Sequence, residues 1–400
     1  MLKPLIIDYD YKLLNSASGQ IARNFWEQQV DNGFNPIIVC SPANFDFDGK
    51  VTTIEVRDRK WFHYIGSALK KIGQPGLALM PDMFKYSWAR YVKKYVKGLE
   101  FDYIHTLSSP QSTHLAGLAL KRKTGKPWVA QFNDPWTDSA GRRNHKPNFS
   151  KSIDAYYEKQ VVENADLIIH TNSVIADIWT ERYGDSIKEK MAVVPLNFNI
   201  KELPSINPVI QDKYDGKLNI SHIGEIYGSR SCADLLRGVV MLVEKHSELR
   251  DMIHITFVGR IKKEEATLPK ELGISELVEI IPPLPPEKLD KYYSSSDIFF
   301  AADVKSPRSP SFPSKLMMYY YYRKPILGIT NPNSIMELEL NRTGNTVCYY
   351  GHPEQICEYL YRAITDYKCL NTFDQSYWQN YTVENVSNLY KSLLLKILKK

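Results

Sequence analysis

Residues 218–245, LNISHIGEIYGSRSCADLLRGVVMLVEK, decide the fold of the second half of the chain. The apolar run Leu218–Ile223 predicts a buried strand, and the apolar spacing of Ala233–Lys245 predicts a helix. A glycine-containing turn between a strand and a helix presents backbone N–H groups, and a basic residue there can clamp a diphosphate. Gly224 and Arg230 are therefore candidates for an anion site; the alternative is a flexible turn with an exposed arginine.

The same alternation of apolar runs and helical patterns extends through both halves of the chain. In the first half it predicts strands at Pro4–Asp8, Asn35–Cys40, Asp102–Thr106, Pro127–Gln131 and Ala165–Thr171, with helices at Gln20–Asn32, Thr113–Lys123 and Ile153–Glu163. In the second half it predicts further strands at His254–Gly259, Glu279–Ile281, Asp297–Ala301, Pro325–Ile329 and Asn345–Tyr349, with helices at Glu287–Ser295 and from Ser314. Two sets of βαβ units predict an α/β protein with two Rossmann-like, doubly wound domains.

A Pro- and Asn-rich passage, residues 196–207, is the expected linker. We expect a first domain over 1–196, a second over 197–375, and a C-terminal segment, 376–400, whose amphipathic helix packs back on the first domain. Ligands of such sheets bind outside the carboxyl ends of the strands, so this architecture favours a two-substrate enzyme or a hinge-type binding protein.

Composition and missing motifs exclude several classes of protein. The chain has 400 residues, 43% of them hydrophobic and 24% charged, as expected of a globular protein with more than one core. Its longest apolar runs are shorter than a membrane span, its start does not resemble a signal peptide, and its five cysteines form no CxxC pair, so we expect a cytoplasmic protein without disulfides. Dinucleotide, Walker A, nucleophile-elbow and metal-ligand motifs are absent, so we expect no cofactor and no metal.

A second anion candidate lies in residues 311–319, SFPSKLMMY. Pro313 and Ser314 favour a helix start, so the amides of Ser314, Lys315 and Leu316 would point out of the helix. A cation in the first turn of a helix is disfavoured by the helix dipole, and an anionic ligand would remove that penalty. Lys315 is therefore a candidate phosphate-binding residue.

Several short phrases occur along the chain in a characteristic order. In the first half they are the Ser18-Gly19 loop, QFNDPWTDSAG and ENADLIIHTN, and in the second half they are IGEIYGSR, ITFVGR, PPLPPEKLDKYYSSSDIFF, PSKLMMYYYYRKPILGI and NYTVENVSNLYKSLL. Together these phrases resemble the retaining glycosyltransferases of the GT-B fold, in the glycogen-synthase-like group (family four-like). The resemblance implies two Rossmann-like domains facing a central cleft, with a nucleotide-sugar on the second domain and an acceptor on the first.

The resemblance also implies roles for single residues. The basic pair that holds the donor's diphosphate corresponds to Arg230 and Lys315, and the base would lie near Pro283 and Leu284 in the proline loop. In the first half, the loop Ser18-Gly19 would lie close to the phosphate and the sugar. Asp134 occupies the position where the family places a His or Asp near the transferred sugar; the alternative is a helix or turn cap.

One departure from the family concerns two glutamates separated by seven residues. Their positions hold Pro310 and Met318, and methionine cannot bind the ribose hydroxyls as the second glutamate does. The loop before them is basic instead, with Lys305 and Arg308. Either these residues draw an acidic sugar, or the donor site has decayed, or the loop is a solvated basic surface.

The basic surplus of the chain is concentrated in residues 51–150, which hold 17 Lys and Arg against 7 Asp and Glu. Within it, residues 84–97 repeat aromatics at Phe84, Trp88, Tyr91 and Tyr95 among basic residues. On a helix this pattern suits an anionic lipid surface at the inner face of a membrane, while the alternative is a helix that buries its stripe in the core. Nucleic acid is a weaker candidate, because no recognition motif is present.

We therefore expect a glycosyltransferase that moves a sugar from a nucleoside-diphosphate-sugar to a saccharide acceptor, including a lipid-linked one, in surface polysaccharide or glycan biosynthesis. Arg230, Lys315 and helix-start amides would stabilise the departing diphosphate. The alternatives are a nucleotide-sugar 2-epimerase of GT-B fold and a catalytically inactive sugar-nucleotide-binding scaffold, which the two missing glutamates favour.

Overall fold

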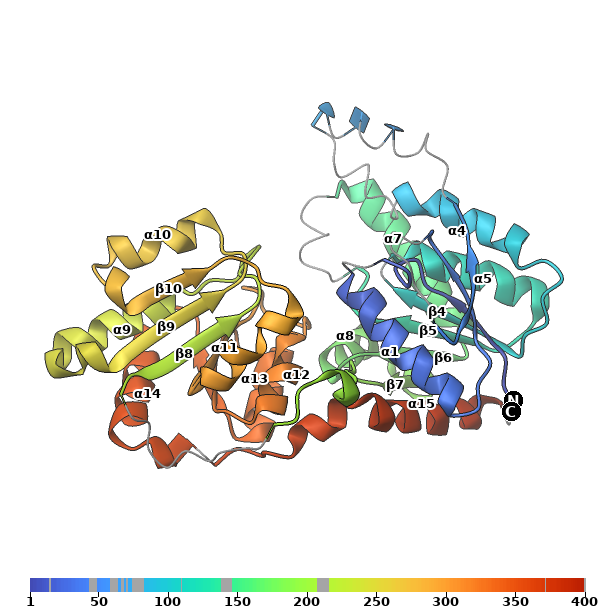
Figure 1. The fold of residues 1–400 in the computed structure, drawn as a ribbon. Helices are drawn as coiled ribbons and strands as arrows, with labels where there is room; N and C mark the ends of the chain where they lie inside the picture. The colour runs from blue at the N-terminus through green and yellow to red at the C-terminus, as the bar shows by residue number, and fades with distance from the viewer. Residues whose placement is uncertain are drawn as a thin grey trace. The chain divides into compact units, whose positions relative to one another are not determined.

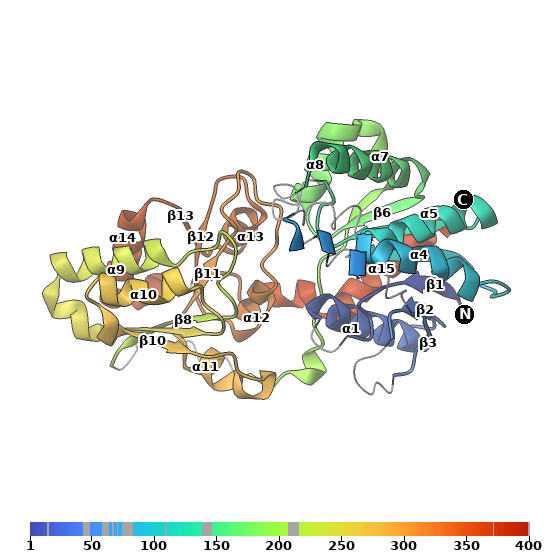
Figure 2. The ribbon, with the colours of Figure 1, turned by 90° about the horizontal axis from the view of Figure 1, so that it is seen from above.

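The structure, a computed structural model, describes residues 1–13, 16–42, 49–57, 64–65, 68–69, 71–73, 83–108, 110–137, 146–206, 216–370 and 372–398. The chain divides into two compact units, of which the first comprises Met1–Ile200 with Asn380–Lys400 and the second comprises Lys201–Gln379. Each unit has a parallel β-sheet between helices, as Figure 1 and Figure 2 show. The expected α/β fold is confirmed.

The sheet of the first unit has seven strands in the order β3-β2-β1-β4-β5-β6-β7, all parallel. The strands are β1 (Pro4–Ile7), β2 (Ile37–Cys40), β3 (Thr52–Glu55), β4 (Tyr103–Ser108), β5 (Trp128–Phe132), β6 (Leu167–His170) and β7 (Met191–Val193). Strands β1, β4 and β6 are buried along their whole length because helices cover both faces of the sheet. This burial explains the nearly continuous apolar runs of β1 and β6, whereas β4 also buries the polar His105, Thr106 and Ser108.

Among the described residues, four helices pack on one face of this sheet and two on the other. The first group is α4 (Met83–Tyr95), α5 (Ser112–Thr124), α7 (Asn148–Asn164) and α8 (Ser173–Tyr183); the second is α1 (Ala17–Asp31) and α15 (Val383–Leu398). Tyr390 of α15 is fully buried, and its hydroxyl oxygen lies 3.0 Å from the hydroxyl oxygen of Tyr103 and 2.8 Å from Nδ1 of His105. The first unit is thus completed by a helix that follows the second unit in the sequence.

The sheet of the second unit has six parallel strands in the order β10-β9-β8-β11-β12-β13. The strands are β8 (Leu218–Ile223), β9 (Ile253–Val258), β10 (Val278–Ile281), β11 (Ile298–Ala302), β12 (Ile326–Thr330) and β13 (Thr346–Tyr349). The strand order reverses between β8 and β11, as it does between β1 and β4 in the first unit. Crevices at such switch points are where doubly wound sheets bind ligands.

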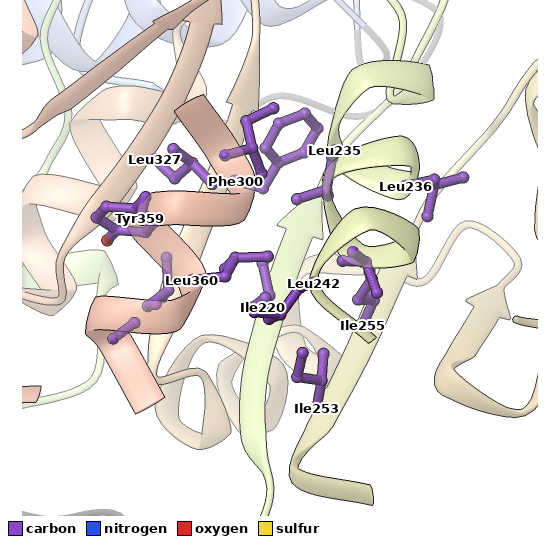
Figure 3. Close-up of a cluster of buried hydrophobic side chains, with 14 of the residues drawn as sticks. Ile220, Leu235, Leu236, Leu242, Ile253, Ile255, Phe300, Leu327, Tyr359 and Leu360 are labelled. Atoms are coloured by element: carbon purple, nitrogen blue, oxygen red, sulfur yellow. The ribbon is translucent and has the colours of Figure 1, made fainter. Parts of the chain in front are cut away.

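The main core of the second unit lies between its sheet and two helices, α9 (Ala233–Lys245) and α14 (Pro353–Thr365). Figure 3 shows Leu235 and Leu242 of α9 and Leu360 of α14 around Ile220 of β8. The two helices pack closely because Gly238 has no side chain: a Cβ there would lie 2.8 Å from the Ile356 side chain.

The remaining helices of the second unit are α10 (Lys263–Glu271), α11 (Asp290–Ser295), α12 (Lys315–Tyr322) and α13 (Ile335–Thr343). On the face of the sheet opposite α9, the ring of Phe299 stacks on that of Tyr319 of α12, with a centroid distance of 4.2 Å. This packing places the first turn of α12 near the carboxyl ends of β8 and β11.

Candidate functional site

Two glycine turns form the base of the candidate site in the second unit. Gly224 follows β8 with a φ of +133°, and Gly259 follows β9 with a φ of +134°, a region that favours glycine. A Cβ on Gly259 would lie 2.3 Å from the carbonyl oxygen of Gly224, and the Gly224 N–H donates to the carbonyl of Val258 at 2.8 Å. The two turns therefore pack backbone against backbone.

Lys315 lies directly over Gly224. A Cβ on Gly224 would be 3.1 Å from Nζ and 3.2 Å from Cε of Lys315, so a side chain there would push the end of the lysine aside by a few tenths of an ångström. Lys315 Nζ lies 2.7 Å from Nε2 of His222, the penultimate residue of β8. Burial and the neighbouring Arg230 charge lower the pKa of Lys315 to about 7.

Arg230 is the second cation of this site. Its guanidinium lies over the Tyr227 ring, 4.6 Å from the centroid, and its positive charge lowers the pKa values of both Lys315 and His222. Among the described residues, neither Arg230 nor Lys315 forms an ion pair with a carboxylate. The charges of Glu225 and Asp303 act on these cations without forming an ion pair with them. Two neighbouring cations that lack an ion-paired carboxylate make a favourable site for an anionic ligand.

The start of α12 supplies fewer backbone donors than expected. The Leu316 N–H donates to the carbonyl of Pro313 at 2.9 Å, so it is already engaged. Within the described part of the chain, the amides of Ser314 and Lys315 have no hydrogen-bond acceptor. These two amides, rather than that of Leu316, are the ones available to an anion.

The basic loop after β11 is organised by Asp303, a residue that the sequence motifs did not single out. Asp303 is fully buried and accepts hydrogen bonds from the Val304 N–H at 2.6 Å, the Ser309 hydroxyl at 3.1 Å and the Thr330 hydroxyl at 2.8 Å. Burial raises the pKa of its carboxyl to about 6. The only sequence signal for this role was an acidic residue directly after a buried strand.

Lys305 and Arg308 lie on this loop. The Lys305 N–H donates to the Ser229 hydroxyl at 3.0 Å, which ties the loop to the turn that carries Arg230. Lys305 Nζ lies 4.6 Å from the centroid of the Tyr350 ring, while Arg308 adopts a left-handed backbone with a φ of 50°. At the positions of the two family glutamates, Pro310 and Met318 are half-buried.

The proline loop follows β10, at the edge of the second sheet. There Pro283 is exposed and Leu284 is half-buried. The structure thus brings Gly224, Arg230, Lys305, Ser314 and Lys315 to the carboxyl ends of the central strands, and places the proline loop at the carboxyl end of an outer strand.

A separate polar group lies at the switch point of the first unit. The Gly19 N–H donates to the hydroxyl of Ser16 at 3.1 Å, and a Cβ on Gly19 would lie 2.2 Å from the carbonyl oxygen of Asp10, so this position requires glycine. Asn133 Nδ2 donates to the Ser18 hydroxyl at 3.5 Å. Asp134 is exposed at the carboxyl end of β5. Residues 138–141 of the phrase QFNDPWTDSAG lie outside the described residues.

Asn133 connects this group to α15. Gln131 Nε2 donates to Asn133 Oδ1 at 3.2 Å, and Gln131 Oε1 lies 3.0 Å from Nε2 of His105, which in turn contacts Tyr390. Ser18, Gln131 and Asn133 line one small cavity in the first unit. Gln131 and Asn133 belong to the phrase QFNDPWTDSAG, but their residue types alone predicted no role for them.

The aromatic stripe of residues 84–97 is turned mainly toward the core. Trp88 is fully buried and its indole N–H donates to the Val56 carbonyl at 2.9 Å, whereas Tyr95 is 44% exposed. The side chain of Phe84 lies outside the described residues. The expectation that this stripe faces a lipid surface is therefore wrong for Trp88, because its side chain is packed in the core of the first unit and cannot reach a lipid surface. In the described ranges no helix has both the length and the apolar character of a membrane span.

Comparisons with known proteins agree with this fold. Over its whole length the chain is similar in structure to sucrose-phosphate synthase from Thermosynechococcus elongatus, with a TM-score of 0.70, 13% identity and full coverage of both chains. It is also similar to the Anabaena protein HepE in complex with UDP-glucose, with a TM-score of 0.66 and 12% identity, covering 99% of this chain and 100% of the other. The lipopolysaccharide outer core galactosyltransferase WaaB gives a TM-score of 0.66 at 12% identity, covering 99% of each chain. These similarities show that the chain has the fold of GT-B glycosyltransferases, so the expected GT-B fold is confirmed.

Parts of the sequence are also similar to known glycosyltransferases. Residues 19–199 match the domain described as Glycosyltransferase Family 4. Among curated proteins, the D-inositol 3-phosphate glycosyltransferase of Corynebacterium urealyticum is 28% identical over 225 residues, which is 50% of each chain. The match spans about half the length of that relative.

Proposed function

We propose that the protein is a glycosyltransferase that moves a sugar from a nucleoside-diphosphate-sugar to a hydroxyl group of a saccharide acceptor, in surface polysaccharide or glycan biosynthesis. The observation that carries this proposal is the pair of cations, Arg230 and Lys315, without a carboxylate partner among the described residues, over the Gly224 turn. The family 4 domain and the similarity to a protein in complex with UDP-glucose support it.

The donor would lie on the second unit and the acceptor on the first. The two cations and the amides of Ser314 and Lys315 would hold the diphosphate, and they stabilise it further as negative charge grows on the leaving phosphate. Gly224 supplies the close approach of backbone to ligand. No metal ion enters this scheme, since the two cations supply the positive charge.

For the reaction we propose retention of the anomeric configuration. The sequence patterns assign no carboxylate as a nucleophile, so a front-face displacement is preferred to a covalent glycosyl-enzyme intermediate. In this displacement the leaving phosphate accepts the proton of the acceptor hydroxyl. The bond from the anomeric carbon to the phosphate oxygen breaks as the bond to the acceptor oxygen forms.

Removal of either cation tests the assignment. Arg230→Ala and Lys315→Ala should each lower turnover about 100-fold, the order of magnitude for loss of one group that stabilises developing charge. Arg237→Ala, which removes an exposed arginine of α9 in the same unit, should retain activity. Turnover is measured as release of nucleotide from UDP-, GDP- and ADP-sugars. Full activity in both cation variants would contradict the assignment.

The basic loop favours an acidic sugar on the donor. Lys305 is tied to the Arg230 turn through Ser229, and its positive charge is exposed. A panel that pairs neutral hexoses with uronic acids on the same nucleotide tests this, with Lys305→Gln expected to reduce only the use of the acidic sugar. Equal use of both sugars by the wild type would contradict it.

The same panel separates the alternatives. Release of free nucleotide supports a transferase, recovery of an isomerised donor supports a 2-epimerase, and binding without release supports a scaffold. The half-buried Met318, where the family has a ribose-binding glutamate, is the observation that favours the scaffold.

We further propose peripheral attachment to an anionic membrane, which would give access to a lipid-linked acceptor. A pocket beside α4 and α5 is lined by the apolar Leu115 and Ala119 and by three exposed basic residues, Arg90, Lys93 and Arg122. Basic residues beside apolar surface are attracted to anionic lipid. Flotation with anionic vesicles at low salt should carry the protein upward, and Arg90→Glu with Lys93→Glu should reduce this. Absence of binding at low salt would exclude attachment.

A further inference from the structure

His222 occupies an unusual position for a polar side chain. It is 1% exposed, next to the end of the central strand β8, where the other residues on the same face, Leu218 and Ile220, are apolar. A buried polar group without partners is unfavourable, so the hydrogen bonds of its two ring nitrogens define what the residue does.

The first nitrogen fixes the tautomer. Nδ1 lies 2.9 Å from the backbone carbonyl oxygen of Phe300 on the adjacent strand β11. A carbonyl oxygen can only accept, so Nδ1 carries the hydrogen. Burial and the positive charge of Lys315 lower the pKa of His222 well below its ordinary value, so the ring is neutral and Nε2 has a bare lone pair.

The side-chain partner of Nε2 is Lys315, and the backbone of Glu225 also lies close enough to the ring to act on its pKa. Lys315 Nζ lies 2.7 Å from Nε2, and the same Nζ passes over Gly224 at the position where a Cβ would be 3.1 Å away. The ring is held from a rigid strand, so it fixes the end of an otherwise flexible four-carbon side chain. A carboxylate in this position would also hold the lysine, but it would neutralise the charge that the diphosphate needs; a neutral imidazole holds it without neutralising it.

We propose that His222 is a positioning residue for donor binding: its Nε2 holds Lys315 over Gly224, beside Arg230, so that both cations meet the diphosphate in a preorganised arrangement. This inference rests on the proposed function. It assigns a role to a residue that does not itself touch the substrate.

The test is a double-mutant cycle with inorganic pyrophosphate as the probe, measured by calorimetry at one pH. His222→Leu should weaken binding about 10-fold or more, the scale for loss of a hydrogen bond to a charged group. In a Lys315→Met background the same change should have little further effect, because its target is gone. His222→Gln, whose amide oxygen can accept from Lys315, should recover part of the affinity. The matched control is His254→Gln in the neighbouring strand β9, where the ring lies 3.5 Å from Glu279, and it should bind as the wild type does.

The outcomes separate this inference from the function on which it rests. If Lys315→Met leaves pyrophosphate affinity unchanged, the proposed diphosphate site is wrong. If Lys315→Met weakens binding but His222→Leu does not, or weakens it equally in both backgrounds, only the role of His222 is wrong. Nitrogen-15 NMR of the wild type is independent of any folding defect in the variants: a neutral ring with hydrogen on Nδ1 supports the proposal, and hydrogen on Nε2 overturns it.

Discussion

Lys315 shows how strongly the surroundings of one residue decide its chemistry. It begins a helix, lies beside another cation and is removed from solvent, and each of these features disfavours its charge. A charged Lys315 in these surroundings lowers the stability of the ligand-free protein, and a bound anion would offset this unfavourable free energy. Arg230 and Lys315 could be chosen from the sequence because glycine turns and helix starts are local features. His222 and Asp303 could not, because their partners Lys315 and Thr330 are distant in the sequence.

The lowered pKa of Lys315 predicts a pH dependence of ligand affinity. The diphosphate requires the ammonium form, so affinity for pyrophosphate should fall as the pH rises above about 7. In the variant Lys315→Arg the side chain stays charged over this range, while the protonation of pyrophosphate changes with pH in the same way for both proteins. The difference in pyrophosphate affinity between wild type and variant, measured by calorimetry between about pH 6 and 9, therefore reports the protonation of Lys315. A parallel pH dependence in both proteins would contradict the assignment.

Linkage gives the sign for stability. Between about pH 7 and the ordinary Lys pKa of 10.5, the unfolded chain binds a proton at Lys315 that the folded chain does not. The contribution of this group to the free energy of unfolding therefore rises with pH across that window. Below about pH 7, Lys315 is protonated in both states, and its unfavourable contribution to the free energy of unfolding is largest.

At the scale of elements, prediction was best where burial is greatest. The central strands β1 and β11 have apolar runs that stand out in the sequence, because both faces of each sheet are covered, while β4 and β8 alternate apolar with buried or half-buried polar residues. The edge strands β3 and β7 were not predicted: each is short, and β3 has no fully buried residue. The amphipathic pattern of α4 indicated a helix with one apolar face, but only tertiary packing decided that Trp88 would point into the core.

The contact between α9 and α14 gives a prediction about stability. Gly238→Val should lower the free energy of unfolding of the second unit by about 1–3 kcal/mol, because the added atoms overlap Ile356 and the carbonyl of Pro353. Chemical denaturation followed by circular dichroism measures this. Lys245→Ala, at an exposed position of the same helix, should change it by less than about 0.5 kcal/mol. Equal stability of the two variants would mean that the helices do not pack as described.

At the scale of the whole molecule, the two doubly wound sheets could be predicted from the alternation of strands and helices. The order of the strands could not, since register and neighbours are set by packing between distant segments. The same holds for α15: its apolar spacing predicted an amphipathic helix, while its burial against α1 depends on Tyr390 and the residues around it.

Tyr390 gives the prediction at this scale. Tyr390→Ala should destabilise the first unit by about 3 kcal/mol or more, because it removes a buried aromatic ring and leaves Tyr103 and His105 without its hydroxyl. Lys396→Ala, at an exposed position of the same helix, is the matched control. Hydrogen exchange should show faster exchange in the strands of the first unit and none of that change in the second. A loss spread evenly over both units would contradict the prediction.

The late position of α15 also bears on how the protein is made. A ribosome completes the entire 201–379 segment before it reaches the residues that cover Phe25 and Trp26. During synthesis the apolar surface of the first unit therefore stays uncovered until α15 has been made. The second unit, although it starts later, has its complete sequence before the first unit does. In the cell, such a surface is a target for chaperones until translation supplies the missing helix.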